Sequence, residues 1–130
     1  DGQAGHIWPT DTCVPISRLA EAVTWAQNKA AEMGLTATIV GHVGDGNFHV
    51  GLSVDPGDQA NMAKAETYTH ALGEMALRLR GTVSGEHGIG IGKQQFMAAE
   101  HGAAVATMRA IKTALDPSNI LNPGKLLPPA

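Results

Sequence analysis

The chain has little of what several classes of protein depend on. It has one cysteine, Cys13, so it cannot form an internal disulfide, and a lone cysteine is more often packed than catalytic. Charged residues make up only 16% of the sequence and the net charge is −3, which leaves no basic stripe for nucleic acid or an anionic membrane. No apolar run approaches the roughly 20 residues that span a bilayer, and the first residues do not show the charged n-region and apolar h-region of a signal peptide. We therefore expect a soluble, cytoplasmic protein that binds no nucleic acid.

The length of 130 residues is that of one domain and is sufficient for a real hydrophobic core. We therefore predict a single domain over 1–130. The chain begins with Asp1 and has no initiator methionine, which suggests that it is a piece of a longer protein.

Apolar residues at helical spacing predict two helices in the first two thirds of the chain. The first begins at Ser17 and ends before Gly34, a residue suited to the left-handed conformation that follows a helix. The second begins near Asp55-Pro56, an N-cap acceptor followed by a proline, and ends before Gly81.

A third helical region extends over 93–115. Gly102 is expected to split it, and Asp116-Pro117 to end it. Its apolar residues recur on one side of the helix, which predicts a buried stripe made of Val105, Met108, Ile111 and Leu115.

Between the first two helices the apolar pattern changes to a period of two, which predicts a β-hairpin. A loop over residues 44–47 would place Val43 opposite Phe48 and bury one apolar face. The same register places His42 directly opposite His49 on the other face, with Cβ atoms about 4.5–5.5 Å apart.

Two imidazoles at that separation can bind one cation, since zinc, manganese and iron all accept neutral histidine. The stretch GTVSGEHGIGIGK, residues 81–93, supplies a carboxylate, Glu86, among glycines that let the backbone come close to a ligand. His42, His49 and Glu86 would then form a set of two histidines and one carboxylate with open positions for substrate and water. His87, the next residue, would be left as a base.

Other interpretations of these motifs stay open. A histidine pair with this spacing is far less specific than paired CxxC motifs, and Glu-His among glycines also occurs in ordinary turns. In one alternative the histidine pair is incidental and the chain is an interaction or oligomerisation module. In another the chain is a metal-dependent hydrolase. The run GIGIGK lacks the spacing and the following Ser or Thr of a phosphate loop, and we expect His70 and His101 to be solvated helix residues.

Four separated motifs occur together and in order: TDTCVPISRLAEAV, GHVGDGNFH, GTVSGEHGIGIGK and IKTALDPSNILNPGKLLP. With them the chain resembles the C-terminal domain of FAD-linked 2-hydroxy-acid dehydrogenases and oxidases, most of all the flavin-dependent, cytochrome-linked D-lactate dehydrogenases. The resemblance covers nearly the whole chain. It implies an α+β fold, a ferredoxin-like antiparallel sheet packed with helices, that caps a flavin held by a separate N-terminal domain.

The resemblance also implies roles for individual residues. His42, His49 and Glu86 would bind a divalent metal such as Zn, Mn or Fe, and His87 would be the catalytic base. Asn47 would help to bind the substrate, and Asn122 would approach the FAD.

The implied reaction oxidises a small D-2-hydroxy acid, D-lactate first, to the 2-keto acid with hydride transfer to FAD. Relatives acting on glycolate or D-2-hydroxyglutarate are the nearest alternatives. Electrons would pass to a cytochrome or quinone, and this acceptor could place the protein at the periphery of a membrane. Exposed apolar surface could favour a homodimer. The substrate-clamping arginine of such enzymes precedes the TDTCVP motif and falls outside this chain, as does the FAD-binding domain, so we expect the isolated chain to be inactive.

Overall fold

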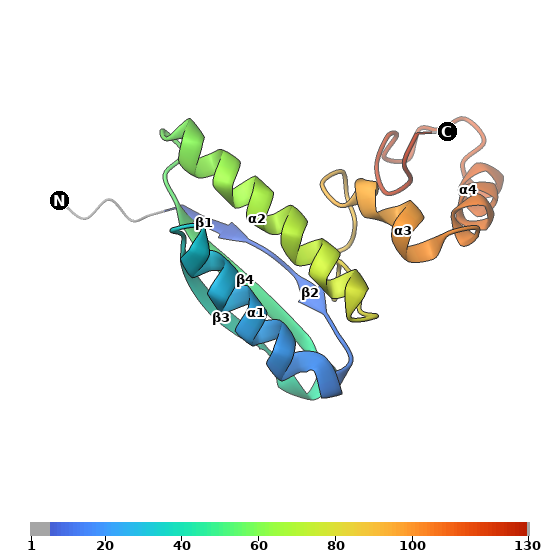
Figure 1. Cartoon of the computed structure of the whole chain (residues 1–130). Coiled ribbons are helices and arrows are strands. Elements are labelled where there is room, and N and C mark those ends of the chain that lie inside the picture. Colours follow the sequence, from blue (N-terminus) through green and yellow to red (C-terminus); the bar gives the residue numbers. More distant parts are fainter. Residues whose placement is uncertain (1–5, 130) are drawn as a thin grey trace. The chain divides into compact units, whose positions relative to one another are not determined.

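A computed structural model of the chain describes residues 6–129 (Figure 1). The chain forms two compact units, Asp1–Glu86 and His87–Ala130, and each is described by itself. Within residues 6–129 no helix is both long enough and apolar enough to cross a membrane.

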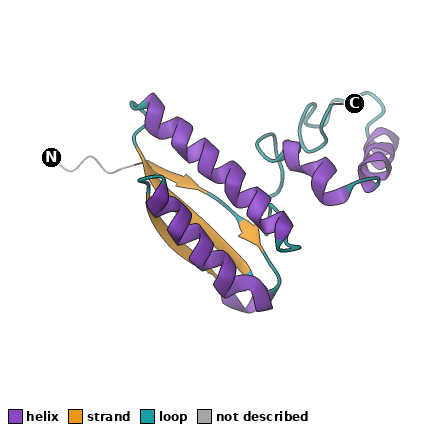
Figure 2. Ribbon diagram, in the orientation of Figure 1, coloured by secondary structure: helices purple, strands orange, loops and turns teal. Residues whose placement is uncertain are grey.

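The first unit is an antiparallel sheet with two helices on one face (Figure 2). Strand β4 pairs with β3 along one edge and with β1 and then β2 along the other. This arrangement confirms the predicted α+β class with an antiparallel sheet packed with helices. The elements are β1 (His6–Pro9), β2 (Thr12–Cys13), α1 (Leu19–Glu32), β3 (Thr36–His42), β4 (Asn47–Val54) and α2 (Gln59–Arg78).

The core lies between the sheet and these two helices. Alternate residues of β4 point into it, and α1 contributes small side chains that allow close packing. Tyr68 of α2 is fully buried and donates its hydroxyl to the carbonyl of Ala26 at 2.9 Å, and burial raises the pKa of Tyr68 to about 12. The central core residues are Ala22, Ala26, Ala30, Phe48, Val50, Leu52, Val54, Ala65, Tyr68, Leu72, Met75 and Ala76.

Both predicted helices form, and one boundary differs. Helix α1 follows a short 3-10 turn at Ile16–Arg18 and ends before Gly34, whose φ of +66° confirms the predicted left-handed residue. Helix α2 begins later than predicted, because Asp58 is the N-cap and accepts from the backbone N–H groups of Ala60 and Asn61. Asp55 instead accepts from the N–H of Gly57 in the preceding turn, so its carboxylate is engaged before the helix begins.

The predicted hairpin forms, but its register was wrong by two residues. The loop occupies residues 43–46, so His42 pairs with Asn47, and Val40 with His49. Val43 lies in the turn and is 69% exposed, so it does not pack against the core. The cause is Gly46, which takes a left-handed φ of +73° and closes the turn one residue earlier. A register shift of two residues does not change the face on which a strand residue lies, so the remaining residues of β3 and β4 stay on their predicted faces.

The second unit contains α3 (Met97–His101) after a 3-10 turn at Gln94–Phe96, and α4 (Ala104–Leu115). Gly102 separates the helices with a φ of +52°, and α4 ends before Asp116, as predicted. The predicted buried stripe of α4 was wrong: Ile111 and Leu115 are 55% and 77% exposed. Helical periodicity identifies the apolar side of a helix but does not show whether another element covers that side.

Candidate metal centre

The segment after α2 reaches the open face of the sheet by pairing with the edge strand. Thr82 and Cys13 exchange backbone hydrogen bonds of 2.8 and 3.2 Å. A Cβ at Gly81 would lie 2.2 Å from the carbonyl oxygen of Cys13, so this approach requires glycine. The pairing extends the edge of the sheet and brings the following residues, including Glu86, over the polar face of β4.

A buried carboxylate, Asp11, holds this segment in place. Asp11 Oδ2 accepts from the backbone N–H of Glu86 at 2.9 Å and from the hydroxyl of Ser84 at 3.1 Å. Asp11 Oδ1 accepts from Asn47 Nδ2 at 2.8 Å. A Cβ at Gly85 would lie 1.9 Å from Asn47 Nδ2. Gly81 and Gly85 therefore let the backbone approach other parts of the chain, whereas a Cβ at Gly88, Gly90 or Gly92 would meet nothing within 4 Å.

His49 is oriented by an irregularity in the edge strand. The pairs Pro9–Gly51 and Thr12–Phe48 belong to one continuous register, which places Thr10 opposite Val50. The Val50 N–H donates to the Thr10 hydroxyl at 2.9 Å, where a regular ladder would use the carbonyl. The Thr10 carbonyl is then available to His49 Nδ1, 3.2 Å away.

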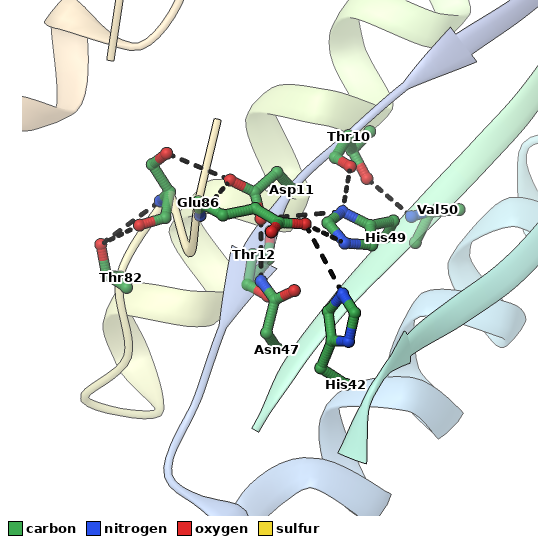
Figure 3. Close-up of polar contacts among 10 residues, drawn as sticks. Thr10, Asp11, Thr12, His42, Asn47, His49, Val50, Thr82 and Glu86 are labelled. Carbon is green, nitrogen blue, oxygen red and sulfur yellow. Dashed lines mark hydrogen bonds and ion pairs between the residues drawn. The ribbon is translucent and has the colours of Figure 1, made fainter. Parts of the chain in front are cut away.

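Three candidate metal ligands converge on the open face (Figure 3). His49 Nε2 lies 2.9 Å and His42 Nε2 3.8 Å from the same Glu86 oxygen. The two imidazole rings are perpendicular, with centroids 6.0 Å apart. His42 is 63% exposed and His49 17% exposed, so one ligand borders solvent while the other is fixed in the protein.

Both ring nitrogens of His49 face oxygen atoms that can only accept a hydrogen bond. Nδ1 lies 3.2 Å from the Thr10 carbonyl, and Nε2 lies 2.9 Å from a carboxylate oxygen of Glu86. A neutral imidazole carries one proton, so it can donate to only one of the two. When the proton is on Nδ1, the Nε2 lone pair is left to bind a cation.

The ligand set fits a divalent transition metal. Zinc binds imidazole nitrogen and carboxylate oxygen at about 2.0–2.2 Å, which sets neighbouring ligand atoms about 3–3.5 Å apart. The three candidate ligand atoms lie within 4.8 Å of one another, so small side-chain movements suffice to close the set. Two histidines and one carboxylate leave positions for a substrate or water.

The other predicted site residues occupy different settings. Asn47 is buried, donates Nδ2 to Asp11 and to the Thr12 carbonyl, and has no hydrogen-bond partner for Oδ1 among the described residues. His87 follows Glu86 directly and is exposed as the first residue of the second unit. Asn122, in the second unit, has a φ of +47° and lines a surface pocket of about 430 Å³.

Two histidines to which the sequence assigned no role, His70 and His101, lie on helices. His70 is half exposed, 3.8 Å from Glu74 on the same helix, and His101 of the second unit lies 3.8 Å from Glu100. His70 is exposed, as predicted, whereas His101 and Glu100 are only partly exposed, at 32% and 12%.

Sequence reasoning missed Thr10 and Asp11, which contact the candidate ligands His49 and Glu86. Both are almost fully buried, at 4% and 2% exposure. The entry segment has no clean period, so periodicity gave them no role. A usable signal was the polar run Thr10-Asp11-Thr12 between two prolines, because polar residues in an edge strand must find partners when they are covered.

Comparison with known proteins identifies a family and several relatives. Residues 2–126 match the family model of the C-terminal domain of FAD linked oxidases. The chain is 43% identical over 121 residues to "D-lactate dehydrogenase [cytochrome], mitochondrial" of Arabidopsis thaliana, with 92% of this chain and 21% of the relative covered.

Two further relatives carry other substrates in their names. A glycolate oxidase subunit of Bacillus subtilis is 36% identical over 117 residues, covering 89% of this chain and 25% of the relative. A mitochondrial D-2-hydroxyglutarate dehydrogenase of Danio rerio is 33% identical over 125 residues, covering 95% and 23%. The chain thus spans about a fifth to a quarter of the length of these curated relatives.

Proposed function

We propose, from the premise that the chain belongs to the family of FAD-linked oxidase C-terminal domains, that it is the metal-binding cap of a flavin-dependent D-2-hydroxy-acid dehydrogenase. The observation that carries this proposal is the convergence of His42, His49 and Glu86 on one point of the open sheet face. Family membership supports the flavin, and the ligand geometry supports the metal.

D-lactate is the substrate we propose first, since the Arabidopsis relative at 43% identity carries that activity in its name. A small substrate is compatible with Gly51, which lies two residues from His49 on the same face of β4 and adds no side chain there. Glycolate and D-2-hydroxyglutarate are the alternatives, in line with the names of the other two relatives.

His42, His49 and Glu86 would hold a divalent metal, which would supply Lewis-acid chemistry to orient a 2-hydroxy acid and make its hydroxyl more acidic. Within the chain, Glu86 contributes the negative charge of the ligand set, and the two imidazoles contribute neutral nitrogen. With the proton on Nδ1, a hydrogen bond from His49 to the Thr10 carbonyl would keep the Nε2 lone pair directed at the open side. Asn47 shapes the floor of this site and offers Oδ1 as an acceptor.

His87 is proposed as the base that takes the proton of the substrate hydroxyl. Oxidation to the 2-keto acid removes this proton and, from the α-carbon, a hydrogen with two electrons. An FAD held by an N-terminal domain would supply the acceptor for that hydride. General-base catalysis is typically worth about 10²–10⁴-fold, so His87→Asn should lower the rate of flavin reduction by that factor while substrate still binds.

The remaining partners follow from the same proposal. An N-terminal domain would hold FAD, with Asn122 of this chain approaching the cofactor. A cytochrome or quinone would reoxidise the flavin and could recruit an otherwise cytoplasmic protein to a membrane surface. Self-association into a homodimer is a further proposal, checked by the mass of the intact protein in solution.

The test is anaerobic flavin reduction in the intact protein that contains this chain. D-lactate, glycolate and D-2-hydroxyglutarate are mixed with the enzyme as isolated, after metal removal by a chelator, and after metal is restored. We expect one D-2-hydroxy acid to reduce the flavin quickly, a large loss after chelation and recovery with metal. L-lactate serves as the control substrate and should react poorly.

The matched control variant is His70→Ala, which removes a histidine beside a glutamate on the surface of α2. It should reduce flavin at the wild-type rate, whereas His42→Ala should behave like the chelated enzyme. Fast reduction by D-lactate in both the chelated enzyme and His42→Ala would contradict the metal-dependent mechanism.

A further inference from the structure

Asp11 is a buried carboxylate that lies beside the candidate metal centre but is not one of its three candidate ligands. Its side chain is fully buried, and the continuous register of the edge strand places it opposite His49. Its Oδ1 atom lies 3.7 Å from His49 Nδ1, which is too long for a hydrogen bond but places the carboxylate beside the imidazole. The interruption between β1 and β2 thus delivers two groups to one imidazole, the Thr10 carbonyl and the Asp11 carboxylate.

The same carboxylate fixes the backbone from which Glu86 projects. Its Oδ2 atom accepts from the Glu86 N–H and the Ser84 hydroxyl, both on the segment that carries the ligand. Its Oδ1 atom accepts from Asn47, at the start of the strand that carries His49. The Asp11 side chain therefore hydrogen-bonds both to the segment that carries Glu86 and to the strand that carries His49.

The hydrogen bonds from Asn47, Ser84 and Glu86 give the Asp11 carboxylate a structural role, and its negative charge can add a second role. Burying a carboxylate is costly, and hydrophobic residues of similar volume often stabilise a protein as well or better. The charge is useful if a cation binds beside it. Asp11 and Glu86 together carry two negative charges next to His49, which a divalent metal held by two neutral imidazoles would balance.

We propose that Asp11 is a positioning residue for metal binding, which fixes the Glu86 backbone and increases the electron donation of His49. The inference rests on the proposed function, since it requires that His42, His49 and Glu86 bind a metal. Asp11 itself touches neither metal nor substrate. Its effect is therefore on the affinity and geometry of the site.

The key variant is Asp11→Asn, which keeps the volume and removes the charge. An amide has one oxygen and one NH₂ group, so it cannot accept from Asn47 on one side and from Ser84 and Glu86 on the other. Loss of such outer partners typically lowers metal affinity about 10–100-fold, and we expect a loss in this range. Ser84→Ala, which removes only one of the hydrogen bonds, should cause a smaller loss.

The experiment titrates Zn²⁺ into the metal-free intact protein in competition with a chromophoric chelator, and records the visible spectrum of the Co²⁺ form. Tyr68→Phe is the control for stability, because it removes a buried hydrogen bond in the helical core without touching the site. It should retain wild-type Zn²⁺ affinity and the wild-type Co²⁺ spectrum, whereas Asp11→Asn should weaken binding and shift the Co²⁺ bands.

The outcomes separate the two proposals. If wild-type protein binds no Zn²⁺, or binds it equally after His42→Ala and Glu86→Ala, the metal centre is wrong and this inference fails with it. If wild-type binds through those residues and a folded Asp11→Asn variant has unchanged affinity and spectrum, only the positioning role is overturned. Should Asp11→Asn not fold, unchanged affinity in Ser84→Ala overturns it instead.

Discussion

The backbone of Gly85 lies directly against the side-chain amide of Asn47, so closely that a Cβ at position 85 would be 1.9 Å from Nδ2. The amide cannot retreat without losing its hydrogen bonds to Asp11 and to the Thr12 carbonyl. This contact sets how closely the segment bearing Glu86 approaches β4. The position of a candidate ligand therefore depends on a missing side chain one residue away.

Gly85→Ala should therefore displace Glu86 and weaken metal binding at least as much as the loss of a supporting hydrogen bond, by about 10-fold or more. Zn²⁺ affinity of the intact protein is the measurement. Gly44→Ala is the matched control, since a Cβ at that turn glycine meets nothing within 4 Å. Equal affinities of the two variants would show that the close contact is irrelevant to the site.

Thr10→Val should destabilise the edge of the sheet, because the Val50 N–H loses the hydroxyl that accepts its proton. An unsatisfied buried donor costs about 1–3 kcal/mol. Native-state hydrogen exchange of β4 in the intact protein should be faster by the corresponding factor, and Thr10→Ser should exchange like wild-type. Unchanged exchange in Thr10→Val would mean that the Val50 N–H donates to the backbone carbonyl of residue 10 in the variant, and that this carbonyl no longer contacts His49.

Much of the first unit follows from local patterns in the sequence. The histidine pair was predicted on the open face because a period of two fixes the face of each strand residue, and that result survived the error in register. The register depended on whether the loop ends at residue 46 or at residue 47. It ends at Gly46, which takes a left-handed φ of +73°, and the spacing of apolar residues does not reveal this conformation.

The residues that hydrogen-bond to the candidate ligands could not be predicted in the same way. Asp11 meets Ser84 and Glu86 across more than 70 positions of the chain, and only the folded edge of the sheet brings them together. The exposed stripe of α4 shows the converse limit. Its periodicity was correct, but burial depends on the elements that surround a helix, which its own sequence does not specify.

Asp116 should give the second unit an acid-dependent stability. Its carboxylate accepts from Lys112 and from the backbone N–H groups of Ile120 and Leu121. The Lys112 hydrogen bond holds the pKa of Asp116 below its ordinary value of 3.8, although burial opposes the shift. A lowered pKa in the folded state contributes stability that is present above 3.8 and is lost as the pH falls through the folded value.

Hydrogen exchange of the peptide covering residues 116–121, corrected for intrinsic rates, should therefore show constant protection down to about pH 4 and a loss below it. Asp116→Asn should have weaker protection at neutral pH and little acid dependence. Protection that falls already between pH 7 and 5 would contradict the assignment, since a carboxyl with a lowered pKa does not titrate there.

The thiol of Cys13 should react slowly. Burial raises its pKa above the ordinary 9.0, and the negative charges of Asp11 and Asp45 add to the shift. The thiolate is the reactive form, so alkylation by iodoacetamide at pH 8 should be slower than that of a small free thiol and should increase with pH. Asp45→Asn should accelerate it modestly, and a rate above that of the free thiol would show that the pKa is lowered.

The central claim is that His42, His49 and Glu86 hold one divalent metal, and elemental analysis of the intact, tag-free protein tests it most directly. Wild-type protein and His70→Ala should each contain close to one equivalent of a transition metal per chain. His42→Ala and Glu86→Ala, purified in parallel and shown to be folded, should have lost most of it. A full equivalent of metal in both of these variants, or none in folded wild-type protein, would contradict the account.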